Sequence, residues 1–271
     1  MAKITIVPVS GLGNRMRVVT SVVKVAPQIE GGVRIVWQPT WDFRARFDEL
    51  FEPIEKAGVT IDSGSIFDTP ATKDNLFFPM LLRKFRYQKE WRCFLPSESI
   101  NLLSLAENYH SFYMDSCYAL GPYEASDVRE TFKPKFELKE QILKITEKFS
   151  DKMLGVHVRR ADNKMSIRYS PLASFRKRID ELLEKGETDR IFLCTDDECV
   201  RDYFRKTYGD KVLTRRIFLN RNSLQGIQDA VVDLWSLSRT SHILGSYYSS
   251  FSDTAAELSG VPFEVIQCQE K

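Results

Sequence analysis

Short apolar runs alternate with longer amphipathic segments through the second half of the chain. The short runs, such as 189–197 and 242–248, are rich in β-branched and aromatic residues, which is typical of buried strands. The longer segments repeat apolar residues three and four positions apart, as Leu224 and Ile227 do, which predicts helices. Strands that alternate with helices in this way predict an α/β fold with a parallel, doubly wound sheet.

The expected elements of this half follow one another closely. A first helix is predicted at 142–149. After it come predicted strands at 153–158, 189–197, 211–216, 242–248 and 262–266. The predicted helices between these strands are 170–186, 198–207, 223–240 and 249–260.

The first half starts with the same pattern and then becomes irregular. One βαβ unit is predicted from a strand at 3–9, a turn at 10–14, a helix at 15–26 and a strand at 33–39. Beyond it we expect a helix at 47–58, a loop at 62–75, a basic and aromatic segment at 81–94 and a strand within 107–118.

The length of the chain favours two domains, because 271 residues are more than one small core usually holds. We place the boundary where Pro134 stands among charged residues, which gives domains at 1–134 and 135–271. The near balance of 39 Lys and Arg against 37 Asp and Glu gives no reason to expect nucleic acid as a partner.

Cysteine usage and the N-terminal segment bear on the cellular setting. The five Cys are odd in number and form no Cys-x-x-Cys pair, which argues against a disulfide framework and against a zinc site. The first residues lack the long apolar stretch that a signal peptide or a membrane anchor needs. We therefore expect a cytoplasmic protein without a transmembrane segment.

Polar segments stand at the carboxyl ends of several predicted strands. In a doubly wound sheet, ligands gather at these ends because the loops open into a crevice toward which the following helices direct their positive N-termini. The polar segments are Gly11–Arg15, His157–Asp162, Thr195–Asp197 and Tyr247–Ser252. The polarity of ordinary turns explains serines and aspartates better than it explains a histidine followed by paired arginines.

The glycine turn after the first strand is open to two interpretations. Gly11 and Gly13 let the backbone approach a ligand closely, and the helix that begins near Asn14 and Arg15 offers free amide donors. Alternatively, the turn is purely structural. A nicotinamide fingerprint is disfavoured because the third glycine and the acidic residue at the end of the second strand are missing, and no Walker lysine follows.

The segment HVRRAD ends a predicted strand in charged residues. The two-residue period of a strand places His157 and Arg159 on one side and Arg160 on the other. A guanidinium at the end of a buried strand needs a partner, and a diphosphate offers two acceptors that match its fork. Asp162 is the alternative partner, in which case the pair is an internal salt bridge that holds the loop.

Three further groups have both a structural and a functional interpretation. Asp196 and Asp197 are close enough to suggest a metal site, but adjacent aspartates before a helix more often cap it. The serines at 249–252 either cap a helix or hold a phosphate at its N-terminus. Asp233 stands among apolar residues of its helix, where it lies on a solvated face or needs a strong donor such as guanine or Arg159.

Taken together, the motifs resemble those of the α-1,6-fucosyltransferases, a family that includes nodulation and animal core fucosyltransferases, with the protein O-fucosyltransferases as more distant relatives. Three motifs occur in the family's order between residues 153 and 260. They are HVRRAD (157–162), FLCTDDE (192–198) and the long segment from NSLQGIQ to DTAAEL (222–258). In the first half the resemblance rests on GLGNR (11–15) and on WQPTWDFRARFDELF (37–51).

The resemblance implies a GT-B fold, with two Rossmann-like lobes that face a cleft. It implies an inverting transfer of fucose from GDP-fucose to a glycan or lipid-linked glycan acceptor, without an obligatory metal or another cofactor. At the matching positions Arg159 would bind the β-phosphate, while Arg160 and Asp162 would shape its loop. His157 and Asp233 would contact guanine.

The remaining donor-binding residues implied by the resemblance come from two loops. Ser249 and Ser250, with Phe251 beside them, would hold phosphate, and Gly11, Gly13, Asn14 and Arg15 would complete the donor site. The family gives no assignable general base, although Asp42, Asp48 and Glu49 lie in a suitable region. A location in the bacterial cytoplasm, or at the inner face of the inner membrane, fits this activity.

The chain also departs from the family. It lacks the additional domains of the animal enzyme, and it carries Tyr247 and Tyr248, with one apparent extra residue, before the serines. The acceptor and the donor sugar therefore stay open. The alternatives are a transferase that uses another GDP-sugar and a catalytically silent protein that binds a GDP-sugar.

Overall fold

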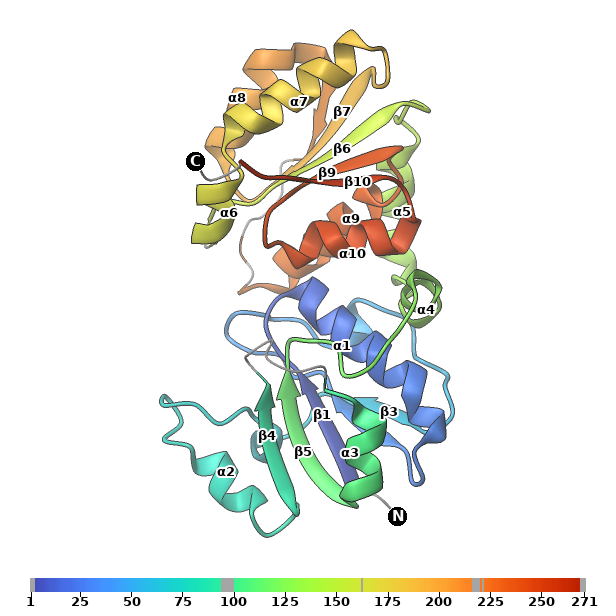
Figure 1. Cartoon of the computed structure of the whole chain (residues 1–271), viewed down its shortest axis with the longest axis vertical. Coiled ribbons are helices and arrows are strands. Elements are labelled where there is room, and N and C mark those ends of the chain that lie inside the picture. Colours follow the sequence, from blue (N-terminus) through green and yellow to red (C-terminus); the bar gives the residue numbers. More distant parts are fainter. Residues whose placement is uncertain (1–2, 94–99, 162, 216–219, 221, 269–271) are drawn as a thin grey trace. The chain divides into compact units, whose positions relative to one another are not determined.

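The computed structural model describes residues 3–93, 100–161, 163–215, 220 and 222–268 (Figure 1). Contacts divide the chain into two compact units. The first consists of Met1–Lys135 with Arg221–Ile227, and the second of Phe136–Asn220 with Gln228–Lys271. The boundary expected from the sequence lies one residue before this division, and the grouping of 221–227 with the first unit was not expected.

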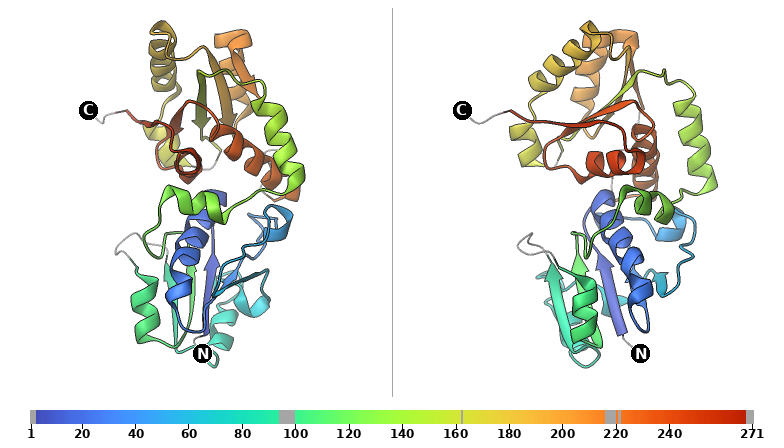
Figure 2. Two further views of the ribbon diagram at one scale, coloured as in Figure 1. Left: turned by 90° about the vertical axis from the view of Figure 1, so that its right-hand side faces the viewer. Right: turned by 45° about the vertical axis from the view of Figure 1, so that its right-hand side comes forward.

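The first unit contains a five-stranded parallel sheet in the order β3-β2-β1-β5-β4 (Figures 1 and 2). Its strands are β1 (Lys3–Pro8), β2 (Val33–Val36), β3 (Val59–Asp62), β4 (Lys89–Cys93) and β5 (Ser111–Ser116). Its helices are α1 (Leu12–Val25), α2 (Phe78–Arg83), α3 (Leu102–Asn108) and α4 (Ala125–Thr131), with short 3₁₀ turns at Ala26–Gln28, Phe47–Glu49 and Ile66–Asp68. Helix α1 packs against β1, α3 and α4.

The expected helix at 47–58 is wrong. The structure has only the 3₁₀ turn Phe47–Glu49 there, and Pro53 prevents a helix from continuing. The aromatic residues that suggested a helical period surround the fully buried Trp37 instead. Its ring lies edge-on to Phe47 and Phe51 at centroid distances of 5.5 and 6.1 Å. Packing around one large ring, and not helical periodicity, therefore explains the spacing.

The second unit confirms the prediction of a doubly wound parallel sheet, with the strand order β10-β9-β6-β7-β8. Its strands are β6 (Met153–Val158), β7 (Arg190–Thr195), β8 (Val212–Thr214), β9 (His242–Ser246) and β10 (Phe263–Ile266). Its helices are α5 (Phe136–Thr146), α6 (Lys164–Tyr169), α7 (Leu172–Glu184), α8 (Glu198–Tyr208), α9 (Leu224–Leu237) and α10 (Ser250–Ser259), with a 3₁₀ turn at Gly209–Lys211. Helix α6 was not expected from the sequence, and Pro171 separates it from α7.

Helices cover both faces of the second sheet. Phe175 and Ile179 of α7 and Phe204 of α8 bury against one face. Helices α9 and α10 approach the other face at two glycines of the sheet. A Cβ at Gly155 would lie 2.5 Å from Thr240 Oγ1 at the end of α9, and a Cβ at Gly245 would lie 2.5 Å from Ser252 Oγ of α10. These close approaches hold the N-terminal turn of α10 beside the carboxyl edge of the sheet.

We expect Gly155→Ala to destabilise the second unit by about 1–3 kcal/mol, because the added methyl group also meets Leu237 Cδ1 at 2.7 Å and forces the helix away from the sheet. The measurement is the urea midpoint of the wild type and the variant, followed by circular dichroism. Gly121→Ala is the matched control, since a Cβ there makes only an ordinary contact with Val25 at 3.5 Å. Equal midpoints for Gly155→Ala and Gly121→Ala would contradict the packing described here.

Candidate functional site

The strand order of the second sheet reverses between β6 and β9. From β6 the chain runs outward through β7 and β8, and it then returns to the other side of β6 through β9 and β10. Ligands of doubly wound folds bind outside the carboxyl ends of the strands at such a switch point. The residues that follow β6, β7 and β9 there are Arg159, Asp196 and Tyr247.

Ser246, the last residue of β9, ties the two strands of the switch point together. Its hydroxyl accepts a hydrogen bond from the backbone N–H of Arg159 at 2.9 Å and donates one to the carbonyl of His157 at 3.2 Å. The next residue, Tyr247, donates its N–H to Ser170 Oγ at 2.7 Å. These bonds define the backbone from which the side chain of Arg159 projects.

Arg159 forms an ion pair with Asp196, with Nε and Oδ2 separated by 3.2 Å. The side chain of Arg159 is 14% exposed. The carboxylate also accepts the backbone N–H of Arg160 at 2.7 Å. An internal ion pair of Arg159 with an aspartate is therefore present, as one of the two interpretations proposed, but the aspartate is Asp196. Asp162, the partner considered from the sequence, lies outside the described residues.

The two adjacent aspartates have different roles. Asp197 is the N-cap of α8 and accepts from the backbone N–H groups of Cys199 and Val200 at 2.7 and 3.4 Å, which confirms the capping prediction. Asp196 instead faces the loop after β6. The sequence did not reveal the contact of Asp196 with this loop, because the contact depends on the pairing of β6 with β7 in the folded sheet.

Arg160 braces the loop. Its guanidinium donates to the carbonyl of Arg159 at 2.8 Å and to the carbonyl of Ser170 at 2.7 Å. Burial of the group lowers its pKa, and the charge of Asp196 opposes this effect. Because its donors bind the backbone, Arg160 acts on the shape of the loop that carries Arg159.

The first turn of α10 packs on the end of β6. The ring of His157, which is buried, lies 4.7 Å from the ring of Phe251 at an angle of 33°. Ser249 precedes the helix and is also buried, and its carbonyl accepts from Ser252 Oγ at 3.2 Å. Ser250 is the first helical residue. His157, Ser249, Ser250 and Phe251 thus lie at the same edge of the sheet as Arg159.

Asp233 of α9 is buried and paired, so of its two interpretations the solvated face is wrong and the need for a strong donor is confirmed. Arg215, just beyond β8, donates to Asp233 Oδ1 and to Asp229 Oδ1, both at 2.7 Å. Burial raises the pKa of Asp233 to about 6, and the charge of Arg215 opposes the rise. The strong donor is therefore Arg215 and not Arg159. Arg215 could have been found from the sequence, because it is a basic residue at a strand end, the same feature that singled out Arg159.

The glycine turn lies in the first unit and is organised by Arg15. Gly11 precedes α1, and Asn14 donates to Ser10 Oγ at 3.0 Å. The guanidinium of Arg15 is fully buried and donates to the carbonyls of Ser10 and Gln38, both at 2.9 Å. Burial lowers its pKa to about 10. Arg15 therefore joins the loops that follow β1 and β2, and Gly13 is buried within α1.

Asp115, near the carboxyl end of β5, is a buried carboxylate that the sequence did not single out. Within the described part of the chain, neither of its oxygens has a hydrogen-bond partner, and Arg92 Nε lies 3.8 Å from Oδ2. Burial raises its pKa to about 7, against the charges of Arg92 and Arg83. A carboxyl group with this pKa exchanges a proton near neutral pH, which is what general bases require.

The other carboxylates considered as bases have local partners. Asp42 accepts from Thr40 Oγ1 at 2.6 Å. Asp48 pairs with Arg46 Nε at 2.9 Å, and Glu49 pairs with Arg46 Nη1 at 3.3 Å. Their surroundings single out none of the three.

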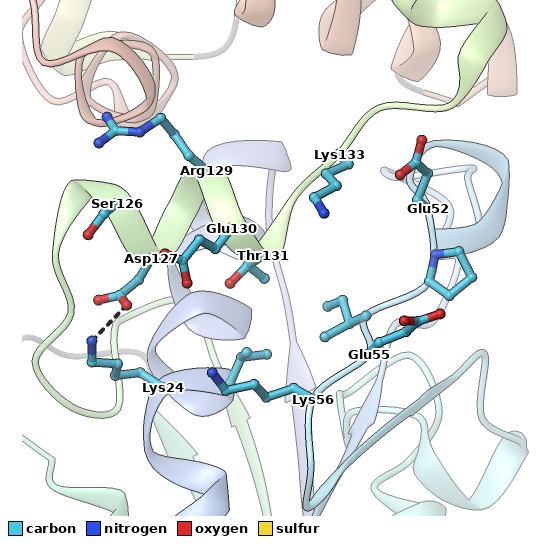
Figure 3. Close-up of a pocket in the computed structure, with 13 residues that line it drawn as sticks. Lys24, Glu52, Glu55, Lys56, Ser126, Asp127, Arg129, Glu130, Thr131 and Lys133 are labelled. Carbon is cyan, nitrogen blue, oxygen red and sulfur yellow. Dashed lines mark hydrogen bonds and ion pairs between the residues drawn. The ribbon is translucent and has the colours of Figure 1, made fainter.

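A cavity of about 1080 Å³ in the first unit is lined by none of the predicted site residues (Figure 3). It is bordered by α1, α4 and the segment after β2, and Lys24 and Asp127 form an ion pair of 2.7 Å at its rim. Its charged lining residues are Lys24, Lys56, Arg129 and Lys133 against Glu52, Glu55, Asp127 and Glu130. This balance of charge indicates no preference for an anionic ligand.

The described residues contain neither a metal-binding group of side chains nor a membrane-spanning helix. No group of three or more His, Cys, Asp and Glu side chains is placed to hold a metal ion in that part of the chain. No helix that the structure describes is both long and apolar enough to cross a bilayer.

We expect Asp115 to make stability depend on pH. Because its pKa rises from 3.8 to about 7 on folding, the folded state binds more protons than the unfolded state between these values. Its contribution to the free energy of unfolding is greatest below about pH 4 and falls up to about pH 7, by at most about 1.4 kcal/mol per pH unit. Urea unfolding at several pH values measures this contribution.

The comparison is between the wild type and Asp115→Asn, with the exposed Asp151→Asn as control. The stability of Asp115→Asn relative to the wild type should increase from pH 4 to 7 and then level off. A difference that does not change with pH would rule out the raised pKa of the buried carboxyl group.

Comparison with known proteins gives matches among solved structures only: no protein-family model matches the chain, and no curated protein matches it. NodZ α-1,6-fucosyltransferase soaked with GDP-fucose matches with a TM-score of 0.63 and 19% identity over 94% of this chain and 92% of that one. The same enzyme has been solved from Bradyrhizobium. POFUT1 in complex with GDP matches with a TM-score of 0.58 and 12% identity over 98% of both chains.

A plant structure completes the comparison. Arabidopsis thaliana FUT1, a mutant in complex with GDP, matches with a TM-score of 0.63 and 12% identity over 100% of this chain and 71% of that one. All three have the two-sheet α/β architecture expected from the resemblance. The chain therefore has the GT-B-like fold of these fucosyltransferases.

Proposed function

We propose that the protein is a glycosyltransferase that moves fucose from GDP-fucose to a glycan or lipid-linked glycan acceptor, with inversion at the anomeric carbon. The observation that carries the proposal is the position of Arg159, which follows β6 at the switch point of the second sheet and pairs there with Asp196. The similar structures contain GDP or GDP-fucose as their ligands.

Arg159 is suited to the chemistry of the leaving group. In an inverting transfer the acceptor hydroxyl gives its proton to a base and its oxygen forms a bond to the anomeric carbon, while the bond from that carbon to the β-phosphate oxygen breaks. The electron pair of the broken bond stays on the phosphate, so negative charge builds on GDP. A guanidinium held at this point stabilises the transition state more than the ground state.

The first turn of α10 would supply the second source of positive potential. Free backbone N–H groups at a helix N-terminus bind phosphate, and the macrodipole adds to the attraction. Ser249 and Ser250 place hydroxyl groups at the same point. With Arg159, these groups would neutralise a diphosphate without a metal ion, which is why we propose a metal-independent reaction. Arg160 and Asp162 would shape the phosphate loop.

Guanine would bind near His157 and Asp233. Guanine presents N–H donors that a carboxylate accepts. His157 lies on the face of the sheet that α10 covers, and Asp233 is a buried residue of α9. The hydrogen bond from Arg215 uses one oxygen of the Asp233 carboxylate and stabilises the buried charge that guanine would meet. The donor-binding role that the resemblance implies for Gly11, Gly13, Asn14 and Arg15 stays a prediction, and within the first unit Arg15 joins the loops that follow β1 and β2.

Asp196 gives the proposal a property that can be measured. Its carboxylate pairs with Arg159 and would lie close to the diphosphate, so a bound phosphate has to compete with it for the guanidinium. Removal of the negative charge of Asp196 should favour GDP, whereas removal of Arg159 should disfavour it. If the ion pair were purely structural, the two substitutions would not change GDP affinity in opposite directions.

We expect Arg159→Ala to weaken GDP binding at least tenfold and Asp196→Asn to strengthen it, as measured by isothermal titration calorimetry. The matched control is Arg190→Ala, because Arg190 stands at the opposite end of β7 and donates to the carbonyl of Lys148 at 3.0 Å. Its GDP affinity should equal that of the wild type. Failure of the wild type to bind GDP, or equal affinities for Arg159→Ala and Arg190→Ala, would refute the proposed site.

Turnover separates the transferase from a silent GDP-sugar-binding protein. With GDP-fucose and a panel of glycan acceptors, we expect acceptor-dependent release of GDP by the wild type. Arg159→Ala should lower kcat/KM by about 10²-fold, the loss typical of one preorganised donor to a developing negative charge. GDP binding without turnover on any acceptor would identify the silent protein, and a preference for GDP-mannose would identify another donor sugar.

A further inference from the structure

Large apolar side chains are exposed on helix α2, which Figure 1 labels, and on the chain around it. We call this apolar surface the α2 surface and define it by seven exposed side chains: Ile66, Phe67, Leu76, Phe77, Phe78, Leu81 and Phe85. Phe85 is 92% exposed and Leu76 is 86% exposed. The 3₁₀ turn Ile66–Asp68 packs beside α2, so the members form one neighbourhood. Large apolar side chains gathered in this way mark an interaction site.

Helix α2 exposes large apolar side chains while it buries an arginine. Phe78 and Leu81 of the helix and Phe85 in the turn after it are exposed, whereas Arg83 is buried. The guanidinium of Arg83 donates to the carbonyls of Phe67 and Thr69 at 3.0 and 2.7 Å. An ordinary amphipathic helix buries its apolar face against its own sheet. Here a buried arginine anchors the helix, and the apolar side chains are left for another partner.

The backbone before α2 also holds apolar side chains outward. Leu76 and Phe77 both have left-handed conformations, with φ of 50° and 55°. Residues other than glycine rarely adopt this region, because it costs about 1–2 kcal/mol per residue. The turn nevertheless leads directly into α2 with Leu76 in solvent.

Basic residues surround the α2 surface. Lys73, Lys84, Arg86 and Lys89 are all exposed. Between 66 and 92, a stretch that the structure describes completely, the one exposed acidic residue is Asp74. The two other acidic residues of the stretch are engaged: Asp68 pairs with Arg34 at 2.9 Å and Glu90 with Arg83 at 2.5 Å. The surface is therefore apolar at its centre and positive around it.

We propose that the α2 surface docks the protein on an anionic lipid bilayer, with its Phe and Leu side chains in the interface and its Lys and Arg side chains on lipid phosphates. A bilayer interface offers hydrocarbon and negative charge together, which matches both features. A second copy of the chain would bring basic residues against basic residues. Docking is independent of GDP binding, so it and the proposed function can fail separately.

The test is cosedimentation of the full chain with large unilamellar vesicles of phosphatidylcholine alone or with 30% phosphatidylglycerol. We expect binding to the anionic vesicles that weakens as salt is added, and little binding to phosphatidylcholine. Lys84→Glu with Arg86→Glu should weaken binding at least twentyfold, because each basic residue near the surface contributes about fivefold. Lys177→Glu with Lys185→Glu, an equal charge change on exposed positions of the second unit, should not.

The apolar contribution has its own matched pair of variants. Leu81→Ser with Phe85→Ser should abolish binding to anionic vesicles, whereas Phe136→Ser with Leu143→Ser, which replaces two exposed apolar residues of α5, should retain it. Circular dichroism spectra and urea midpoints close to those of the wild type should show that both variants fold. The proposal would be overturned if the wild type did not bind anionic vesicles. It would also be overturned if the α2 and α5 double variants lost vesicle binding equally. A wild-type dimer in light scattering that Leu81→Ser with Phe85→Ser makes monomeric would instead assign the surface to self-association.

Discussion

The ion pair between Arg159 and Asp196 is the interaction on which the candidate site depends. It holds a guanidinium at the point where the strand order of the second sheet reverses. The same carboxylate accepts the backbone N–H of Arg160, so Asp196 orients both the side chain and the backbone of the loop. A partly buried cation needs such a partner, and a diphosphate would supply the same charge with better geometry. The pair is thus compatible with a ligand site and not only with a structural role.

The first unit uses its buried charges differently. Arg15 and Arg83 are fully buried, and each donates to two backbone carbonyls of neighbouring loops. Guanidinium groups can serve this purpose because they carry five donors in a rigid fork. Asp115 has no comparable set of partners among the described residues, and its pKa is raised to about 7 as a result of burial. The chemically responsive group of this unit is therefore Asp115, and the role of Arg15 in the glycine turn is architectural.

Helix α2 buries a charged side chain, Arg83, and exposes apolar side chains, Phe78 and Leu81. Since Arg83 and its carbonyl partners already anchor the helix, packing of Phe78, Leu81 and Phe85 is not needed to hold it in place. These side chains then cost solvation free energy unless something covers them. The surrounding lysines and Arg86 make an anionic lipid interface the partner that fits both properties.

The sequence by itself determined the order of strands and helices in the second unit except for α6, because period and turn residues are local signals. It also located His157, Arg159, Ser249 and Ser250 at carboxyl ends of strands, where the fold places ligands. Only the tertiary structure decided the partners, since the Arg159–Asp196 and Arg215–Asp233 pairs join segments that lie 37 and 18 residues apart. The same holds for Trp37, whose ring gathers aromatic residues that had suggested a helix, and for Asp115, whose pKa depends on burial. Local patterns specify which elements form, whereas the environment of a charge depends on which elements meet.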